Sequence, residues 1–375
     1  MTPPRIAFVV NALEDDAPTR MTLLQASMLK ETGWAVAVWA WSRGGKNLEP
    51  LTQKGIVVEV LGGGMIGNVR RLRQKLSEFR PQVVHAALVR PIIGVDLFRR
   101  ANSSAGPGII WLYADHGTHE WHERGGVVGR VLDSAMPRIL NHGERVIAVS
   151  DGATRDLISR GVEESRIEVL PHGVDTNKFR RHPDMKLQTS AAIIMGSLGN
   201  LRAVKGYDIL IRTLALVRDK LPSFEVRIWG EGEERVALER LTAESGLQGV
   251  VKFPGKTDRP VEALQQLDVY IQPSRSESFG LAVAEAMACE LPVIATRTGG
   301  LSSLVVEGET GVLASPADTD DLADALLRLY DERASWKSWG QRGRERIEDD
   351  FSLTRYRERV VGFYTDLTSQ RGVTR

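Results

Sequence analysis

The sequence contains a single cysteine, no long apolar run and almost no net charge, and each of these absences excludes a class of protein. With Cys289 as the only cysteine among 375 residues, the chain forms no internal disulfide and no zinc site built from cysteines is expected. No stretch reaches the ~18 uncharged apolar residues of a membrane span, and the run Ile6–Val10 is shorter than a signal-peptide core. The 49 basic and 48 acidic residues leave a net charge of +1, which argues against nucleic acid as a partner. We therefore expect a cytoplasmic protein that meets membranes only at its surface, on their inner face.

The composition and length are those of a globular protein with two domains. Apolar residues make up 42% of the chain and charged residues 26%, values that are ordinary for folded domains. At roughly 150 residues per domain, the length corresponds to two domains. The polar stretch Asp175–Ser190, which contains Pro183, predicts a linker. We place an N-terminal domain at residues 1–180, a second domain at 181–351, and at 352–375 a C-terminal helix that packs back on the first domain.

Short apolar runs alternate with helical patterns along the whole chain. The runs lack polar alternation, as strands buried on both faces of a parallel sheet do. The predicted strands are Ile6–Val10, Ala35–Trp39, Val57–Val60, Val83–His85, Ile109–Tyr113, Val146–Ser150, Ile167–Leu170, Ala192–Gly196, Glu225–Trp229, Val250–Phe253, Val269–Gln272, Val293–Thr296 and Gly311–Leu313. Helices are predicted at Gly206–Lys220 and Ser352–Thr368, among others. This alternation predicts an α/β protein with two facing doubly wound, Rossmann-like domains and a cleft between them.

Ligands of open parallel sheets bind outside the carboxyl ends of the strands, so residues just after strands are the candidates for chemistry. After Val269–Gln272 a polar loop leads to a helix that starts near Gly280. The first turn of a helix presents N–H groups and a partial positive charge, which suits a phosphate. Glu277 in the loop and Glu285 in the helix carry carboxylates that accept hydrogen bonds from sugar or ribose hydroxyls. Alternatively, Glu277 caps the helix and Glu285 is a solvated surface residue.

Three further loops follow strands of the second half. The loop 199–206 contains Arg202 and Lys205, two cations that can neutralise a diphosphate. Gly230 follows one strand and Phe253-Pro-Gly255 follows another. The simpler interpretation is surface charge in the first loop and ordinary turns in the other two.

The joint pattern of these segments resembles retaining glycosyltransferases of the GT-B fold, the family 4 or group 1 type. The resemblance rests on Glu277-Ser-Phe-Gly-Leu with Glu285 and Glu-Ala-Met-Ala, on Leu291-Pro-Val-Ile-Ala295 with Gly299-Gly300, on Val146–Ala153, and on Val169–Asp175. It implies that Glu277 contacts the donor sugar, Glu285 the ribose, and Arg202 with Lys205 the diphosphate. It also implies donor contacts at Gly199, Gly230, Phe253, Gly255, Ser278, Phe279, Gly280 and Leu281.

The chain departs from the family pattern at four places, two of which are Glu290, where glycine is common, and Ser303, where glutamate is usual. Asn200 stands where the family has arginine, so Arg202 is the candidate for the missing cation. The loop after the first strand reads Asn11-Ala-Leu-Glu-Asp-Asp-Ala-Pro-Thr-Arg20 instead of containing a glycine pair. The resemblance therefore does not define what this first loop contacts.

A histidine-rich segment, 115–123, follows the strand Ile109–Tyr113. Its histidines are His116, His119 and His122. The spacing does not match a zinc-binding helix, and surface histidines in a loop are the simpler interpretation. The resemblance favours a third interpretation, in which His116 orients the donor sugar or the leaving phosphate. We therefore take His116, Glu277, Arg202 and Lys205 as the candidate catalytic residues.

Three other motifs have alternative explanations. Gly62–Gly67 fits G-x-G-x-x-G but follows the third strand and lacks an acidic residue ~20 positions on, which argues against a dinucleotide site. The basic helix Asn68–Arg80 is either a packed helix with a solvated face or a contact for anionic lipid. Asp318-Thr-Asp320 looks like a metal-binding D-x-D, but helix capping explains it better.

The resemblance implies glycosyl transfer from a nucleotide-sugar donor to a glycan or lipid-linked acceptor hydroxyl, with retention, for cell-surface polysaccharide or glycolipid. We expect no metal and no other cofactor, because cations and helix amides stabilise the departing diphosphate. Two alternatives remain. One is a nucleotide-sugar epimerase or phosphorylase of the same fold, and the other is a non-catalytic nucleotide-sugar-binding partner.

Overall fold

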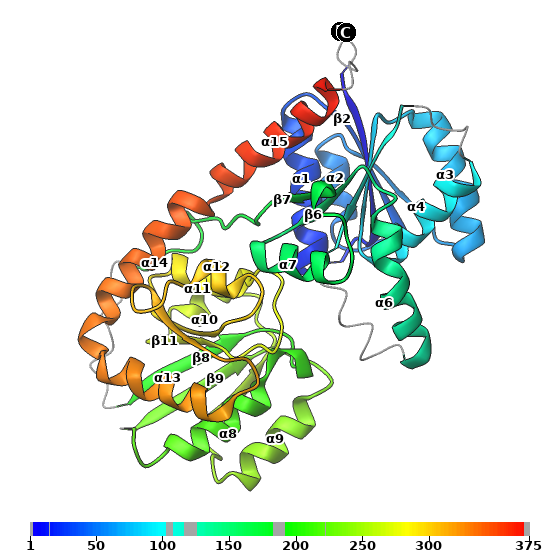
Figure 1. Cartoon of the computed structure of the whole chain (residues 1–375). Coiled ribbons are helices and arrows are strands. Elements are labelled where there is room, and N and C mark those ends of the chain that lie inside the picture. The colour runs from blue at the N-terminus through cyan, green and yellow to red at the C-terminus, as the bar shows by residue number, and fades with distance from the viewer. Residues whose placement is uncertain are drawn as a thin grey trace. The chain divides into compact units, whose positions relative to one another are not determined.

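A computed structural model of the protein describes residues 3–14, 16–102, 108–115, 126–182, 192–221 and 223–370. The chain divides into two compact units (Figure 1). Unit 1 comprises Met1–Val149, Ala153–Pro171 and Tyr356–Arg375, and unit 2 comprises Ser150–Gly152 and His172–Arg355. Each unit is built on its own parallel sheet.

The sheet of unit 1 has the strand order β3-β2-β1-β4-β5-β6-β7. Its elements are β1 (Arg5–Ala12), α1 (Ala17–Glu31), β2 (Ala35–Arg43), α2 (Leu48–Gln53), β3 (Val57–Val60), α3 (Met65–Phe79), β4 (Val83–Ala87), α4 (Val89–Ala101), β5 (Ile110–Ala114), α6 (Gly126–Leu140), β6 (Arg145–Ala148), α7 (Asp151–Ser159), the 3-10 turn η1 (Glu164–Arg166) and β7 (Ile167–Val169). The C-terminal helix α15 (Leu353–Ser369) belongs to unit 1 from Tyr356 onward.

Both faces of this sheet are covered by helices, which explains why its strands are apolar without alternation. β4 and β5 are buried along their whole length, whereas the edge strand β3 is partly exposed. Helices α3, α4 and α6 supply the apolar core on one face, and α1 and α15 pack on the other (Figure 1).

A buried polar cluster joins α15 to the rest of unit 1. The hydroxyl of Tyr364 lies 2.6 Å from Nδ1 of His85 and donates to Gln25 at 3.1 Å. The amide of Gln25 in turn donates to the hydroxyl of Tyr356 at 2.8 Å. All four side chains are buried, so each hydrogen bond satisfies a polar group that has lost contact with water. This agrees with the interpretation of His85 as a core residue.

Unit 2 repeats the same topology, with the strand order β10-β9-β8-β11-β12-β13. Its elements are β8 (Ile193–Leu198), the 3-10 turn η2 (Ala203–Lys205), α8 (Tyr207–Val217), β9 (Phe224–Trp229), α9 (Arg235–Glu244), β10 (Val251–Gly255), α10 (Pro260–Leu264), β11 (Val269–Gln272), α11 (Leu281–Ala288), β12 (Val293–Thr296), α12 (Leu301–Leu304), β13 (Gly311–Ala314), α13 (Thr319–Asp331), the 3-10 turn η3 (Arg333–Ser335) and α14 (Trp336–Asp350). One face of the sheet packs against α8 and α13, and α11 packs against α14 on the other face (Figure 1).

The boundary between the units lies before the predicted linker. Val174 bridges to Ser352, and Arg344 donates hydrogen bonds to the carbonyl groups of Thr176 and Phe179. Residues 172–180, which the sequence assigned to the first domain, therefore pack within unit 2. The second half of the predicted linker, 183–190, lies outside the described residues.

The fold class predicted from the sequence is confirmed: both units are α/β structures with doubly wound parallel sheets. Every predicted strand is present, with ends that differ by up to four residues. The helix predicted at Ser352–Thr368 is observed as α15, and the one predicted at Gly206–Lys220 is observed as α8.

Candidate functional site

The strand order of unit 2 contains one point at which the chain turns in opposite directions. β8 and β11 are neighbours; after β8 the chain continues to β9 on one side, and after β11 it continues to β12 on the other. Such a switch point leaves a crevice outside the carboxyl ends of the two strands, where ligands bind. Residues 199–206 follow β8 and residues 273–280 follow β11. The two loops predicted to hold the donor therefore both lie at this switch point.

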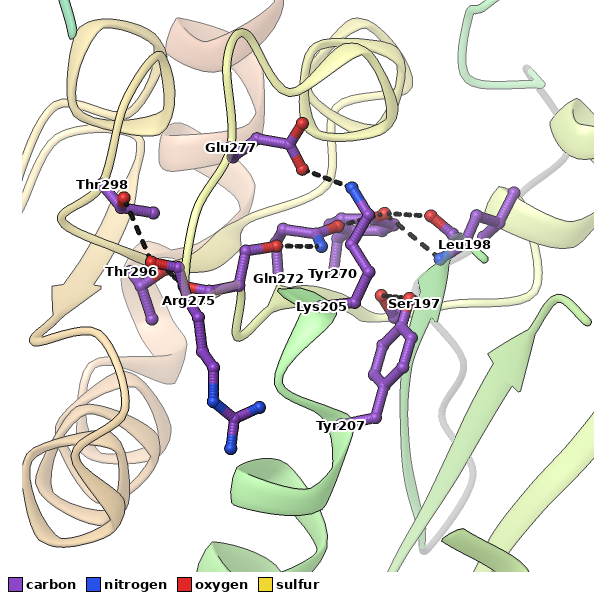
Figure 2. Close-up of polar contacts among 11 residues, drawn as sticks. Ser197, Leu198, Lys205, Tyr207, Tyr270, Gln272, Arg275, Glu277, Thr296 and Thr298 are labelled. Carbon is purple, nitrogen blue, oxygen red and sulfur yellow. Dashed lines mark hydrogen bonds and ion pairs between the residues drawn. The ribbon is translucent and has the colours of Figure 1, made fainter. Parts of the chain in front are cut away.

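Two opposite charges meet between these loops. Nζ of Lys205 donates to Oε2 of Glu277 at 2.6 Å (Figure 2). The two side chains are only 23% and 17% exposed, so water screens their attraction less than it would at an open surface. The sequence predicted both residues for the site, and the structure brings them into direct contact.

Glycines allow the two loops to come this close. Gly206 has a φ of +67°, and a Cβ atom there would lie 2.0 Å from the carbonyl oxygen of Pro273. Any other residue would therefore displace the backbone. Gly280, with a φ of +98°, is the N-cap of α11 and carries no side chain to cap the first turn. The positive end of α11 thus lies beside the Lys205–Glu277 pair, as an anion site requires.

A chain of buried hydrogen bonds supports the loop after β11. The hydroxyl of Tyr270 lies 3.2 Å from both the backbone nitrogen and the carbonyl oxygen of Leu198 and donates to Gln272 at 3.1 Å (Figure 2). The Gln272 amide donates to Oγ of Ser274 at 2.8 Å. Because these groups are buried and paired, they hold the ends of β8 and β11 in one arrangement.

A second buried tyrosine lies beneath the loop after β8. The hydroxyl groups of Tyr207 and Ser197 are 3.1 Å apart, and a Cβ atom at Gly199 would lie 2.7 Å from the Tyr207 hydroxyl oxygen. Burial raises the pKa of Tyr207, so its hydroxyl stays protonated and neutral. Neither Tyr207 nor Tyr270 was predicted for the site from the sequence; the available signal was that a tyrosine within an apolar run needs a hydrogen-bond partner when buried.

An arginine joins the two loops on the side away from the ion pair. Arg275 donates two hydrogen bonds of 2.7 Å to the carboxylate of Asp208 and one of 2.6 Å to the carbonyl oxygen of Ala203. Burial of the Asp208 carboxyl works to raise its pKa, but hydrogen bonds from Arg275 and from backbone amides outweigh it and lower the pKa overall. Neither residue was predicted for the site, although Arg275 lies in the same loop as Glu277 and Asp208 lies in the first turn of the helix that follows Lys205.

The other predicted donor residues lie at the same edge of the sheet. The backbone N–H of Gly230 donates to the carbonyl oxygen of Gly255 at 3.0 Å, and that of Gly199 donates to Trp229 at 2.9 Å. The carbonyl oxygen of Phe253 accepts a hydrogen bond of 2.9 Å from Arg235. The ends of β8, β9 and β10 are therefore adjacent, and Gly199, Gly230, Phe253 and Gly255 form one row beside the switch point.

The segment before α11 is fixed through its backbone. Oγ of Ser150 donates to the carbonyl oxygen of Ser278 at 2.6 Å. The Phe279 side chain is 4% exposed and packs edge-on against His172 and Phe351. A ligand can therefore meet Phe279 only through its main chain. His172, predicted to be structural, is buried in this aromatic contact.

The remaining predicted residues of unit 2 lie in the same loops or in α11. Glu285 lies in α11, and its charge adds to the effect of burial in raising the pKa of Tyr270 well above its usual range. Arg202 precedes η2, and its carbonyl oxygen accepts a hydrogen bond of 3.0 Å from the backbone of Lys205. Leu281 is the first residue of α11. All of them belong to the two loops or to the helix that starts from them.

The predicted catalytic residue His116 lies outside the described residues, as do His119 and His122. The residue before it, Asp115, directly follows β5, is buried and pairs with Arg160 at 3.2 Å. The role of His116 stays a prediction.

Two of the alternative motifs have structural explanations. Asp318 is the N-cap of α13 and accepts hydrogen bonds from the backbone of Asp320 and Asp321 at 3.0 Å each, which confirms the capping interpretation. The glycines after β3 follow an edge strand, not the switch point, and the N–H of Gly63 binds Oδ1 of Asn68 at 2.8 Å. Across the part of the chain that the structure describes, no cluster of three potential metal-ligating side chains is found, and no helix has the length and apolar character of a membrane span.

Comparison with protein-family models gives two matches along the chain. Residues 19–178 match the model "Glycosyltransferase Family 4", and residues 182–346 match "Glycosyl transferases group 1". The D-inositol 3-phosphate glycosyltransferase of Pseudarthrobacter chlorophenolicus is 30% identical over 301 residues, which cover 74% of this chain and 69% of the relative.

Solved structures of similar fold cover almost the whole chain. HepE of Anabaena, crystallised with UDP and glucose, superposes with a TM-score of 0.81 at 20% identity and covers 97% of this chain and 100% of HepE. Sucrose-phosphate synthase of Thermosynechococcus elongatus gives a TM-score of 0.80 at 20% identity, with coverage of 98% and 100%. At this level of identity the likeness concerns the fold.

Proposed function

This chain belongs to the group 1 glycosyltransferases of the GT-B fold, and from that premise we propose that it is a retaining, metal-independent enzyme that uses a nucleotide-sugar donor. The acceptor in this proposal is a hydroxyl group of a glycan or a lipid-linked glycan. The product contributes to cell-surface polysaccharide or glycolipid.

The observation that carries the proposal is the Lys205–Glu277 ion pair at the switch point of unit 2. It places an ammonium group and a carboxylate 2.6 Å apart beside the positive end of α11. The ammonium group and the helix amides attract the diphosphate of the donor and stabilise the charge that develops on it as the glycosidic bond breaks. The carboxylate of Glu277 is then beside the sugar, where it accepts hydrogen bonds from hydroxyl groups. Glu285, farther along α11, does the same for the ribose.

Uridine nucleotides are the first donors to examine, because HepE has been crystallised with UDP and with UDP-glucose. In the proposed site the base lies along the row formed by the ends of β9 and β10, next to Phe253 and Gly255. Backbone groups of that row select the base.

A thermal-shift series tests the donor class. The series compares UDP, GDP, ADP and their sugars, and a ligand at 100 times its Kd adds about 2.7 kcal/mol to the free energy of unfolding. We expect at least one nucleoside diphosphate to raise the Tm of the wild-type protein and to lose this effect when Lys205 is replaced by alanine. No stabilisation by any of them would contradict the proposal.

Product analysis tests the reaction. We expect NMR of the glycosylated product to show the anomeric configuration of the donor. An inverted product would contradict retention. A sugar nucleotide epimerised without acceptor, or a strict need for inorganic phosphate, would point to the epimerase or phosphorylase alternative. Donor binding without transfer or hydrolysis would point to a binding partner.

Metal independence has a direct test. Since the positive charge in the proposed site comes from Lys205, Arg202 and helix amides, we expect turnover to persist in a chelator. Activity that is lost in chelator and restored by magnesium would contradict this part of the proposal.

The proposal includes contact with an anionic membrane through α3. One face of this helix packs inward through Leu72 and Leu76, whereas Arg71 and Arg73 are exposed and Ile66 near its start is 73% exposed. Exposed cations with an apolar residue complement a bilayer that contains anionic lipid.

Sedimentation with vesicles tests this contact. We expect binding to phosphatidylglycerol vesicles that falls when Arg71 and Arg73 are changed to glutamate. The same change at Arg212 and Arg240, which are exposed in unit 2, serves as the control. Equal binding to neutral phosphatidylcholine vesicles would overturn the idea.

A further inference from the structure

The loops at the switch point of unit 2 are joined by a single guanidinium group as well as by the ion pair. The guanidinium group of Arg275 binds both carboxylate oxygens of Asp208 at 2.7 Å and the carbonyl oxygen of Ala203 at 2.6 Å. The backbone N–H of Arg275 donates to the carbonyl oxygen of Val204 at 2.8 Å. Parallel hydrogen bonds from a guanidinium group to a carboxylate fix orientation as well as distance. We call Arg275 and Asp208, with these contacts, the inter-loop clasp.

The partners of Arg275 lie on both sides of Lys205 in the sequence. Ala203 and Val204 immediately precede Lys205, and Asp208 lies in the first turn of α8 three residues after it. On the other loop, Arg275 lies two residues before Glu277. The clasp therefore connects the backbone on either side of Lys205 to the backbone that leads to Glu277.

The clasp faces away from the two charges that it spans. In Figure 2 the side chain of Arg275 extends toward α8, while Lys205 and Glu277 meet on the opposite side of the loop. Its two terminal nitrogens are occupied by Asp208 and Ala203. The arrangement is that of a group that fixes other residues and does not itself contact a ligand.

Without the clasp, the position of Lys205 would depend on flexible groups. A lysine side chain has a flexible stem of four carbons, so its ammonium group can take many positions. A displacement of about 1 Å in a reacting arrangement can cost roughly 100-fold in rate. A rigid connection between the two loops removes this freedom.

We propose that Arg275 and Asp208 are positioning residues that hold the Lys205 ammonium group against Glu277 in the geometry that receives the donor diphosphate. This inference rests on the proposed function for its catalytic consequence, while the geometric consequence can be observed without any nucleotide. The clasp acts only through Lys205, and this distinguishes it from a group that binds the donor or merely stabilises the fold.

The kinetic test compares Arg275→Met in two backgrounds. In the wild-type background we expect kcat for donor turnover to fall roughly 10- to 100-fold, with a smaller change in KM. In the Lys205→Ala background the same substitution should change kcat less than about twofold, because the residue through which the clasp acts is absent. An equal loss in both backgrounds would overturn the proposal, and so would full activity of Arg275→Met.

A matched control uses another arginine–carboxylate contact of unit 2. Arg328 donates to Glu307 at 2.7 Å on the surface of α13, in neither of the two loops. Arg328→Met removes a contact of the same kind, and we expect it to leave kcat unchanged. A loss at Arg328 equal to that at Arg275 would overturn the proposal, since it would indicate a general effect of removing surface ion pairs.

A crystal structure of Arg275→Met without nucleotide separates this inference from the proposed function. We expect the distance from Nζ of Lys205 to Oε2 of Glu277 to exceed 4 Å, or the Lys205 side chain to occupy more than one conformer. An unchanged 2.6 Å contact would overturn the clasp even if the enzyme is a glycosyltransferase. If the wild-type chain binds no nucleoside diphosphate, the proposed function fails and this distance still decides the clasp. Should Arg275→Met not fold, Arg275→Lys replaces it, because an ammonium group cannot make the paired bonds to Asp208.

Discussion

Both sheets place their first strand beside their fourth, so unit 1 and unit 2 each have a switch point at the carboxyl ends of two neighbouring strands. In unit 2 the residues 273–280 separate β11 from α11, and this loop carries Arg275, Glu277 and the glycine that caps the helix. In unit 1 Leu88 alone separates β4 from α4. The topology supplies the location of a site in both units, but only a loop of sufficient length can bring charged side chains to it.

The short connection in unit 1 has its own cost. Leu88 has a φ of 72° and a ψ of 160°, a region that glycine occupies readily and other residues rarely. On the neighbouring strand, Oδ1 of Asn11 is buried, and no hydrogen bond to it is found among the residues that the structure describes. The switch point of unit 1 thus has a strained residue, Leu88, and a buried acceptor, Oδ1 of Asn11. The switch point of unit 2 instead has paired charges and a chain of hydrogen bonds.

The largest expected difference between the two switch points is the effect of removing a nearby cation, Lys205 in unit 2 and Arg90 in unit 1. We expect Lys205→Met to lower kcat by roughly 10²–10³-fold, as loss of a group that stabilises developing negative charge does, and to weaken binding of UDP. Arg90→Met, after the corresponding strand of unit 1, should change the UDP Kd less than about threefold, because the loops that hold the diphosphate belong to unit 2. Calorimetric titration with UDP and donor turnover measure the two effects.

Lys220→Met is the control for loss of a lysine from unit 2, since Lys220 is exposed beyond the end of α8. Its Tm and turnover should match the wild type. If Arg90→Met weakened UDP binding as much as Lys205→Met, the comparison between the two units would fail.

The next effect concerns the close approach of the loops in unit 2. Gly206→Ala should destabilise the protein by roughly 2–5 kcal/mol, because the new Cβ atom combines a left-handed φ with a 2.0 Å contact to the Pro273 carbonyl oxygen. Gly249→Ala is the control: Gly249 has a φ of +81° with no atom within 4 Å of the added Cβ, so only about 1–2 kcal/mol is expected. Urea unfolding measures both, and equal losses would show that the approach of the loops is not tight.

Much of this fold could be predicted because the sheets are buried on both faces. A parallel strand that is covered by helices on both faces is apolar without alternation. The ends of apolar runs such as Val269–Gln272 and Val293–Thr296 therefore predict the ends of the strands. The strand ends in turn located the loops of the site. The C-terminal helix was equally visible from the helical spacing of its apolar residues, and Tyr356, Val360 and Leu367 of that pattern lie on its buried face.

The sequence could not show which side chains of these loops pair with one another. Lys205 and Glu277 are 72 positions apart, and their contact depends on the neighbouring positions of β8 and β11 in the sheet. The clasp could not be predicted for the same reason, because nothing in the sequence near Arg275 indicates that its carboxylate partner lies in the first turn of α8. Strand order is a property of the whole chain, whereas motifs are read within one segment.

The strained backbone at Leu88 predicts that glycine is more stable than alanine there, which is the reverse of their order within a helix. At Leu88, Leu88→Gly should be more stable than Leu88→Ala by about 1–2 kcal/mol, because both remove the same side chain but only glycine tolerates the backbone conformation. At Ser77, an exposed position within α3, Ser77→Ala should instead be more stable than Ser77→Gly by about 1 kcal/mol. If alanine were the more stable residue at both positions, Leu88 would not be strained.

The smallest effect concerns the acid side of the stability curve. The pKa of Asp208 in the folded protein lies below its ordinary value of 3.8, because hydrogen bonds from Arg275 and the backbone outweigh burial. A lowered folded pKa means that the carboxylate stabilises the fold above the unfolded pKa and that this contribution is lost as the pH falls through the folded pKa.

Asp208→Asn should therefore be less stable than the wild type near neutral pH, and this difference should shrink below pH 4. The expected difference is under about 1 kcal/mol, because the side chains of Asp208 and Arg275 are each 33% exposed. Urea unfolding from pH 7 to pH 2.5, with Asp324→Asn on the exposed face of α13 as the control, measures the difference. A gap that stayed constant with pH would show that the charge of Asp208 is not what holds the loops of unit 2 together, and unit 2 would then differ from unit 1 by the Lys205–Glu277 pair, its glycines and its buried hydrogen bonds.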